Sequence, residues 1–388
     1  MSEAPLFISF IVMCVLFAGC VERYYPDQDE LNSGTLVINA HITDQPGIQE
    51  IEISRSATLL FSKFDPVSGC YAELMREDGE SRQFLEARPG FYRSNLDSEF
   101  LLEGSSYRIH VLIPDGEVYE SEFDKLRPVP EIDSIYYHVE TASYQTAGDS
   151  IGGIRFFIDF TYDDEAYEYI RWELIETYEF HNPDMEAWIQ INPWTRRLLP
   201  DTSNYRVCYI TRDVNEIHSM STRYLDKGIY IKKPFGFVPN DKLEQKLLYK
   251  YSLLVRQYSV GQEAFHYWNE LKKTFQEKGF LFDQQPALLK SNICNINDSS
   301  EIILGFFTLS GVSEIRGIAG DIPGLDHTPY RYYCLPADKG PGVAEPAVYP
   351  GYYAQATYNG ATHYELVNKH CVDCRAYKGS THIKPDYW

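Results

Sequence analysis

The residues whose types and spacing could do chemistry gather near the C-terminus, where Cys371-x-x-Cys374 lies between His370 and His382. Zinc takes nitrogen and sulfur ligands in a tetrahedron, and these four side chains are the weak candidates for such a site. The second Cys-x-x-Cys of a typical structural zinc site is missing from the sequence. A c-type haem would need a histidine directly after the second cysteine, where Arg375 stands. A thioredoxin-like dithiol would need a helix to lower the thiol pKa, and none is predicted here.

Motifs of hydrolases and nucleotide-binding enzymes are missing from the sequence. It contains no His-Glu-x-x-His, no Gly-x-Ser-x-Gly and no Gly-x-x-x-x-Gly-Lys-Ser/Thr. We therefore expect no catalytic residues, no metal and no cofactor other than a covalent lipid. An extracellular hydrolase or metal-binding protein that uses the C-terminal Cys/His cluster remains the alternative.

The elements that precede this cluster begin with an export signal. The apolar run from Leu6 to Ala18 has the length of a signal-peptide core and is too short to span about 30 Å of hydrocarbon. It ends in Leu16-Phe-Ala-Gly-Cys20, which resembles a bacterial lipobox. We expect residues 1–19 to be a lipoprotein signal peptide and Cys20 to carry the lipid that anchors the chain. Residues 20–34 are expected to form a flexible acidic tether.

An even number of cysteines in an exported chain indicates disulfide bonds. With Cys14 and Cys20 set aside, six remain, and they allow fifteen pairings. A Cys371–Cys374 bond would close a strained loop of two residues. We expect Cys334 to pair with one of these two cysteines, and Cys208 or Cys294 to pair with the other. Cys70 is then left as a free thiol.

The overall charge restricts the partners. The chain has 388 residues, with 35 Lys and Arg against 56 Asp and Glu, and a formal net charge of −21. Nucleic acids and anionic lipid surfaces attract clustered cations, so neither is an expected partner. The hydrophobic fraction of 44% is enough to fill a core, which excludes disorder for most of the chain.

Alternation of apolar and polar residues predicts a mostly β fold. Short runs at spacings of about 8–12 residues indicate a small antiparallel, Ig- or transthyretin-like sandwich over residues 35–125. Two prolines predict a Pro-rich hinge at 126–131. The longer runs 154–162, 167–180 and 246–258 then predict a larger antiparallel β domain over 132–388, whose C-terminal loops are tied by disulfides.

One segment has the period of a helix. Phe265, Trp268, Leu271 and Phe275 lie three to four residues apart, and predict an amphipathic helix over about 262–278 that packs its aromatic side on a sheet. Ser259 and Gln262 have the spacing of a capping box at its start.

These features occur in an order that resembles a known family. Pro66-Val-Ser-Gly69 and Pro89-Gly-Phe-Tyr92 are similar to a carboxypeptidase-regulatory-like module. Together with the lipobox, Pro128–Asp133, the aromatic helix, Cys371-x-x-Cys374 and the terminal Pro385–Trp388, they resemble the Bacteroidota lipoprotein family catalogued as domain of unknown function 4249. The resemblance implies an outer-membrane lipoprotein that is often encoded beside a TonB-dependent transporter of the starch-utilisation type.

The hypothesis that follows is a surface-exposed, non-enzymatic lipoprotein that serves as an accessory or ligand-capture component of a TonB-dependent transporter. An envelope scaffolding or assembly factor is a further alternative. Tyrosine is abundant, and it is enriched at protein interfaces because it gives a large contact area. The alternative is that tyrosine only covers exposed strands and loops. We expect the contact surface to contain the tyrosines of the Gly/Pro-rich region, namely Tyr330, Tyr332, Tyr333, Tyr349, Tyr352, Tyr353 and Tyr358.

Overall fold

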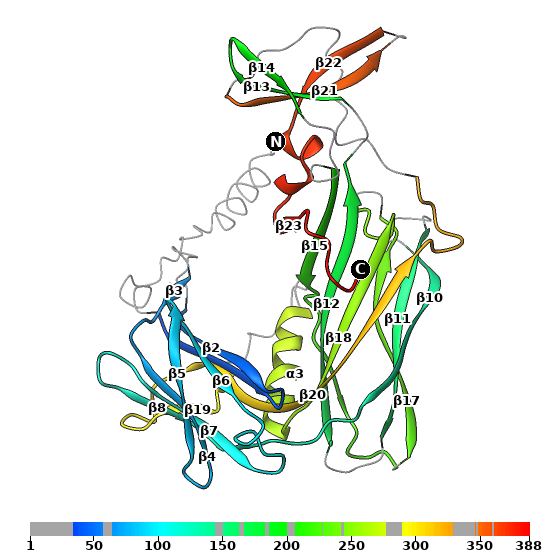
Figure 1. Cartoon of the computed structure of the whole chain (residues 1–388). Helices are drawn as coiled ribbons and strands as arrows, with labels where there is room; N and C mark the ends of the chain where they lie inside the picture. Colours follow the sequence, from blue (N-terminus) through cyan, green and yellow to red (C-terminus); the bar gives the residue numbers. More distant parts are fainter. Residues whose placement is uncertain are drawn as a thin grey trace, which may run out of the picture.

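The computed structural model describes residues 34–56, 64–143, 150–162, 167–182, 186–199, 206–226, 228–241, 244–276, 289–328, 346, 348–358 and 361–388. This part of the chain forms two β-sandwiches, a separate four-stranded sheet and one α-helix (Figure 1). The expected mostly β fold is therefore confirmed. Within the same residues, no helix has the length and apolar character needed to cross a bilayer. The signal peptide, Cys20 and nearly all of the expected tether lie outside the described residues.

The first sandwich is built from strands that alternate between buried and exposed side chains. Its strand β5 changes sheets, because Ser81–Phe84 pair with β4 and Leu85–Arg88 pair with β6. The two sheets enclose one apolar core, which includes Ile38, Ile53 and Leu74. The strands from this part of the chain are β1 (Leu36–Thr43), β2 (Gly47–Arg55), β3 (Asp65–Pro66), β4 (Tyr71–Arg76), β5 (Ser81–Arg88), β6 (Phe91–Leu96), β7 (Ser106–Leu112), β8 (Val118–Ser121) and β9 (Asp124–Lys125).

Residues from much later in the chain complete the first sandwich. Strand β19 (Ile293–Asn295) pairs with β8, and the first half of β20 (Leu304–Gly320) pairs in parallel with β1. Phe307 and Leu309 of β20 lie fully buried in the first core. The domain boundary expected at 131/132 therefore does not separate the two sandwiches in sequence, because residues 293–310, which follow it, belong to the first sandwich.

Glycine allows β20 to approach its neighbours closely. Gly305 has a φ of +86°, and a Cβ at this position would lie 2.2 Å from the carbonyl oxygen of Ile38. At Gly311, where β20 passes from β1 to the second sandwich, a Cβ would lie 2.5 Å from the carbonyl oxygen of Arg127. Side chains at either position would push the strand away from the backbone that it contacts.

The second sandwich packs a three-stranded sheet against a larger one. The smaller sheet contains β10 (Ile132–Ser143), β11 (Ser150–Tyr162) and β17 (Ile229–Pro239). The core between the sheets includes Phe156, Trp172 and Leu253. The larger sheet contains the second half of β20, β18 (Lys250–Ser259), β12 (Tyr169–His181), β15 (Val207–Asp213), β16 (His218–Ser221) and β23 (Ser380–Thr381).

The segment expected to be a hinge is held against the second sandwich. The amide N–H of Gly311 donates to the carbonyl oxygen of Arg127 at 3.2 Å. The side chain of Gln257 donates to the carbonyl oxygen of Pro130 at 2.7 Å. The link at residues 126–131 is thus fixed to β18 and β20, and β20 itself runs through both sandwiches.

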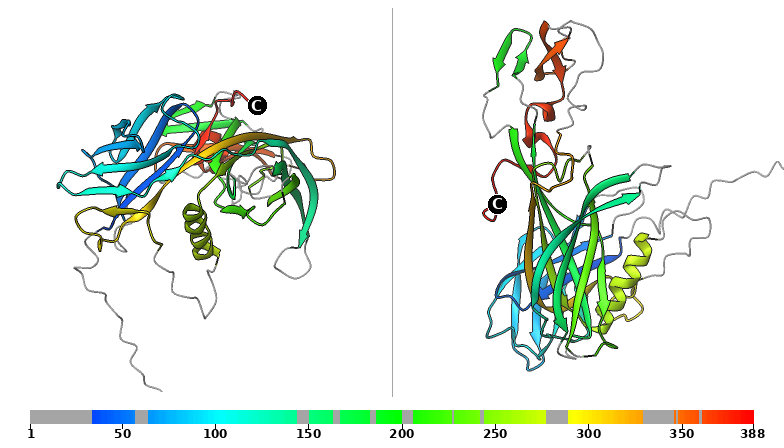
Figure 2. Two further views of the ribbon diagram at one scale, coloured as in Figure 1. Left: turned by 90° about the horizontal axis from the view of Figure 1, so that it is seen from below. Right: turned by 90° about the vertical axis from the view of Figure 1, so that its right-hand side faces the viewer.

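The helix α3 (Gln262–Gln276) lies in the angle between the two sandwiches (Figures 1 and 2). Its aromatic side packs as expected, with the ring of Phe265 4.7 Å from Tyr169 and the ring of Tyr267 4.6 Å from Phe306. The predicted capping box is wrong. Ser259 is the last residue of β18, and its buried hydroxyl has no hydrogen-bond partner among the described residues.

Candidate functional site: a disulfide-locked C-terminal module

A four-stranded sheet stands beyond one end of the second sandwich (Figures 1 and 2). Its strands come from two distant parts of the chain, and alanine and valine form its small buried core at Ala187, Ala354 and Val372. We call this sheet and the two short 3-10 helices after it the C-terminal module. Its elements are β13 (Ala187–Asn192), β14 (Thr195–Leu198), β21 (Gly351–Tyr358), β22 (Ala361–Val367), η2 (Lys369–Cys371) and η3 (Cys374–Ala376).

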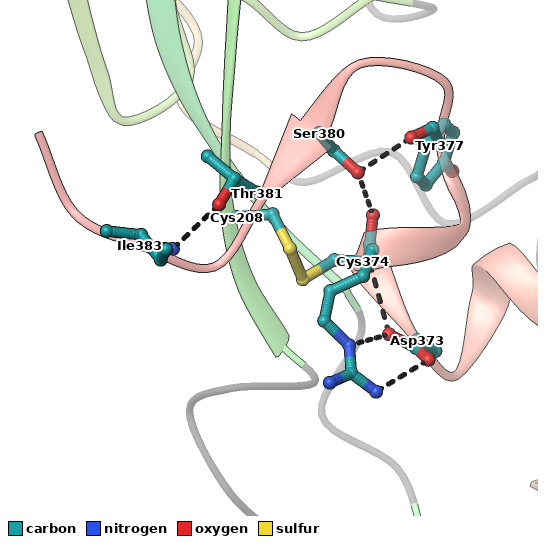
Figure 3. The surroundings of a disulfide bond; sticks show 8 residues. Cys208, Asp373, Cys374, Tyr377, Ser380, Thr381 and Ile383 are labelled. Carbon is teal, nitrogen blue, oxygen red and sulfur yellow. Dashed lines mark hydrogen bonds and ion pairs between the residues drawn. A yellow bond between two sulfur atoms is a disulfide. The ribbon is translucent and has the colours of Figure 1, made fainter.

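A disulfide bond joins this module to the second sandwich. It connects Cys208 of β15 with Cys374 of η3, 166 residues apart in sequence, and both side chains are fully buried (Figure 3). Asp373 precedes η3 and accepts hydrogen bonds from the backbone N–H and the guanidinium of Arg375, at 3.1 and 2.8 Å. Burial alone would raise the pKa of Asp373, but these hydrogen bonds hold it below its usual value. A charged carboxylate therefore caps the turn that carries Cys374.

The structure describes three other cysteines, of which one is disulfide-bonded and two are free thiols. Cys371 is also disulfide-bonded, and Cys334 lies outside the described residues. Cys294 is a free, exposed thiol on β19, so of the two partners that the sequence left open, Cys208 is the one that pairs with Cys374. Cys70 is a half-buried free thiol of the first sandwich, where burial raises its pKa.

The weak zinc candidates do not form a metal site. Cys371 and Cys374 are both disulfide-bonded, so neither offers a thiolate. His370 contacts the ring of Tyr377, with centroids 5.1 Å apart, and His382 is exposed. In the part of the chain that the structure describes, no three His, Cys, Asp or Glu side chains lie close enough together to hold a metal ion. No observation therefore favours the alternative of a metal-dependent hydrolase at this cluster.

The tyrosines expected to form a contact surface have different environments. Tyr353 is 2% exposed, and its hydroxyl donates to the side chain of Gln190 at 2.9 Å, so it belongs to the core of the module. Tyr352 is half-buried against that core, and Tyr349 is half-buried before a cis proline. Tyr330, Tyr332, Tyr333 and the side chain of Tyr358 lie outside the described residues.

Among the described side chains of the module, the most exposed aromatic one was missed by sequence reasoning. Trp194 lies at the turn between β13 and β14 and is 93% exposed, and its backbone N–H donates to Asn192 at 3.0 Å. Ile191 and Leu198 of the same hairpin are 46% and 47% exposed, and Arg197 is exposed beside them. The only signal in the sequence is the Asn-Pro turn before Trp194.

The module also differs in charge from the rest of the chain. The module, its flanking residues and the end of the chain, 186–199 and 346–388, contain six Lys and Arg against four Asp and Glu, whereas the whole chain has 35 against 56. The hairpin therefore presents apolar and basic side chains on a protein that is otherwise strongly acidic.

A second set of contacts, made by the last residues of the chain, also holds the module on the second sandwich. Strand β23 pairs with β15, and the last residues then cross the outer face of the larger sheet. The indole N–H of Trp388 donates to Glu179 of β12 at 2.7 Å. The hydroxyl of Tyr387 lies 2.9 Å from the hydroxyl of Thr177, and the guanidinium of Arg316 lies 3.5 Å from its ring centroid. Contacts to β12, β15 and β20 thus hold the base of the module in place.

These features define a class of protein: a multi-sandwich β protein with a projecting, disulfide-locked module. The sequence matches the family described as domain of unknown function (DUF4249) over residues 21–316, well over half of the chain, and the protein belongs to that family. The matched region ends inside β20, so it includes the first sandwich and most of the second, but not β21, β22, β23 or the C-terminal end.

Other comparisons add little. No curated protein matches the sequence. Among solved structures, the chain is similar to part of the N-terminal region of an enterococcal surface protein, with 11% identity, 62% of this chain and 93% of that chain covered, and a TM-score of 0.15. It is also similar to the BSP domain of a biofilm-associated protein, with 6% identity, coverage of 77% and 61%, and a TM-score of 0.15. Sequence identities and TM-scores this low say nothing about function.

Proposed function

We propose that this protein is an outer-membrane-anchored lipoprotein of Bacteroidota type that works without catalysis as an accessory or ligand-capture component of a TonB-dependent uptake system. A lipid on Cys20 would anchor it, and the sandwiches would be displayed on the cell surface. The lipobox-like sequence and membership of the family support this proposal, as does the sequence order that resembles transporter-associated lipoproteins.

The observation that carries the proposal is the exposed β13–β14 hairpin. Tryptophan and arginine are the residues most enriched where interfaces derive their binding energy, and Trp194 and Arg197 are both exposed on this hairpin. The disulfide and the C-terminal end hold the module rigidly, so that little conformational entropy is lost when it binds. We therefore propose this hairpin as a contact surface in addition to the tyrosines expected from the sequence, with an acidic face of the transporter as its partner.

The test is affinity isolation of the tagged protein from gently solubilised outer membranes, with partners identified by mass spectrometry. We expect a TonB-dependent transporter in stoichiometric amount. The double variant Trp194→Ala, Arg197→Glu is expected to recover less than about a tenth of it, as the loss of a hot spot predicts.

Tyr224 provides the matched control, since it is 90% exposed and lies just beyond β16, which pairs with the opposite end of β12. Tyr224→Ala should recover as much transporter as the wild type. Recovery of the protein alone, or of an envelope assembly complex instead of a transporter, would contradict the proposed function. Equal recovery with the hairpin variant would show that docking uses another surface.

A further inference from the structure

A cleft of about 400 Å³ lies between the outer face of the first sandwich and α3. Strand β1 buries Ile38 and Ala40 in the first core and so turns Asn39 and His41 outward, toward the helix. Seen from below, α3 fills the angle between the sandwiches (Figure 2). Side chains of both sandwiches and of the helix meet around the cleft, among them Asn39, His41, Glu52, Glu173, Tyr267 and Trp268.

Aromatic rings make up much of its wall. Tyr267 and Phe306 stack with centroids 4.6 Å apart at an angle of 28°. The guanidinium of Arg171 lies 3.9 Å from the ring centroid of Trp268 and holds the indole in position. Phe91 of the first sandwich completes the opposite side. Rings fixed in this way offer flat apolar surface without loss of side-chain entropy on binding.

The charges around the cleft are largely compensated within the protein. Glu50 binds Arg93 at 2.6 Å and Arg88 at 3.5 Å. Glu173 forms an ion pair with Arg171 and accepts from the hydroxyl of Tyr258 at 2.8 Å. Such pairs leave oxygen lone pairs for hydroxyl groups while adding little net charge. Neither of these paired carboxylates offers a free counter-charge to a strongly charged ligand.

Unused hydrogen-bonding groups accompany the rings. Glu52 forms no ion pair among the described residues and accepts only from Ser54, at 3.3 Å. The Nε2 atom of His41 and the indole N–H of Trp268 are shielded from solvent, and neither has a hydrogen-bond partner in the described part of the chain. Both residues line the cleft, so a bound group that reaches these two atoms would supply the partners that they lack.

We infer that this cleft binds a neutral ligand that has both hydroxyl groups and a flat apolar face, of which a pyranose sugar is the common biological form. The rings of Tyr267 and Trp268 stand at 84° to each other, so that one of them stacks on the apolar face and the other contacts the ligand's edge. Glu52 and Asn39 bind the hydroxyl groups. This assignment deepens the ligand-capture part of the proposed function, but it does not need the transporter.

The test is a titration of the purified, full mature chain with maltose, cellobiose and lactose, followed by calorimetry. At least one disaccharide should bind with a Kd of about 1 mM or tighter. The affinity should be the same between about 50 and 500 mM sodium chloride, because a neutral ligand is not screened. Spermidine and inorganic phosphate serve as charged probes, and neither should bind.

Three variants separate the site from general stability. Glu52→Gln and Asn39→Ala change side chains outside the core, and each should weaken binding about tenfold, as loss of a hydrogen bond to a hydroxyl predicts. Trp194→Ala removes a tryptophan from the C-terminal module and should bind like the wild type. No binding of any disaccharide at about 20 mM, salt-dependent binding, or binding of spermidine or phosphate alone would overturn the assignment. Because this measurement uses the isolated chain, its outcome is independent of transporter recovery.

Discussion

The indole N–H of Trp172 donates a hydrogen bond of 2.7 Å to the side-chain oxygen of Gln257, inside the core of the second sandwich. The nitrogen of the same amide donates to the carbonyl oxygen of Pro130, also at 2.7 Å. One side chain thus pairs with a core indole and with the backbone that joins the two sandwiches. Both bonds are shielded from water, so no solvent can replace the amide if it is lost.

Gln257→Met keeps most of the side-chain volume but removes both hydrogen bonds. We expect the free energy of unfolding to fall by about 2–4 kcal/mol, because two buried polar groups lose their partners. Urea unfolding of the wild type and the variant measures this difference. Gln83 is exposed on β5, and Gln83→Met should change stability by less than about 0.5 kcal/mol. Equal stability of the wild type and Gln257→Met would show that the amide does not hold the link.

Local patterns predicted the elements of this fold but not their partners. In the run 246–258, the period of two puts Leu247, Tyr249, Tyr251, Leu253 and Val255 on one face of the strand. Four of these side chains are buried, whereas Tyr249 is half-buried and stacks on His181. The return of residues 293–310 to the first sandwich left no such signal. Parallel pairing of β1 with β20 joins residues more than 260 positions apart, and side-chain alternation within a strand does not say which strand lies beside it.

In the candidate site too, local sequence predicts an element but not what covers its side chains. Trp188 and Trp194 belong to one hairpin, yet Trp188 is half-buried and Trp194 is 93% exposed. A tryptophan after a turn has the same local sequence signal whether a neighbouring sheet covers it or not. The disulfide partner of Cys374 stayed open for a related reason, because cysteine spacing carries no information on the distance between Cys208 and Cys374 in space.

Removing the disulfide should loosen the C-terminal module. In the double variant Cys208→Ala, Cys374→Ala, we expect the free energy of unfolding to fall by about 2–4 kcal/mol, since the bond closes a loop of 166 residues. Replacing both cysteines avoids a free thiol that could exchange with the bond at Cys371. Urea unfolding with and without a reductant measures the effect.

Two comparisons make the disulfide measurement decisive. Cys294→Ala removes an exposed free thiol and should leave the stability unchanged within about 0.5 kcal/mol. A reductant should destabilise the double variant further, because Cys371 is disulfide-bonded as well. If the double variant unfolds at the same urea concentration as the wild type, the module is held by the C-terminal end and not by the bond.

His41 should make the stability depend on pH in a defined window. Its ring packs 4.6 Å from Tyr258, and burial together with Arg171 lowers its pKa from 6.5 to about 4, although Glu173 opposes the shift. Between pH 6.5 and 4 the unfolded chain therefore binds a proton at this position that the folded chain does not, so stability falls as the pH falls. Glu173 remains charged throughout, because its pKa is about 2.

Unfolding of the wild type and of His41→Gln across this range isolates the effect. The difference between the two should be constant above pH 7 and should shift in favour of the variant below pH 6.5, by up to about 1.4 kcal/mol per pH unit. His382→Gln controls for the loss of an exposed histidine. Parallel curves for the wild type and His41→Gln would mean that His41 takes up its proton equally well in the folded and unfolded chains. Water would then reach the His41 side chain in the cleft beside α3.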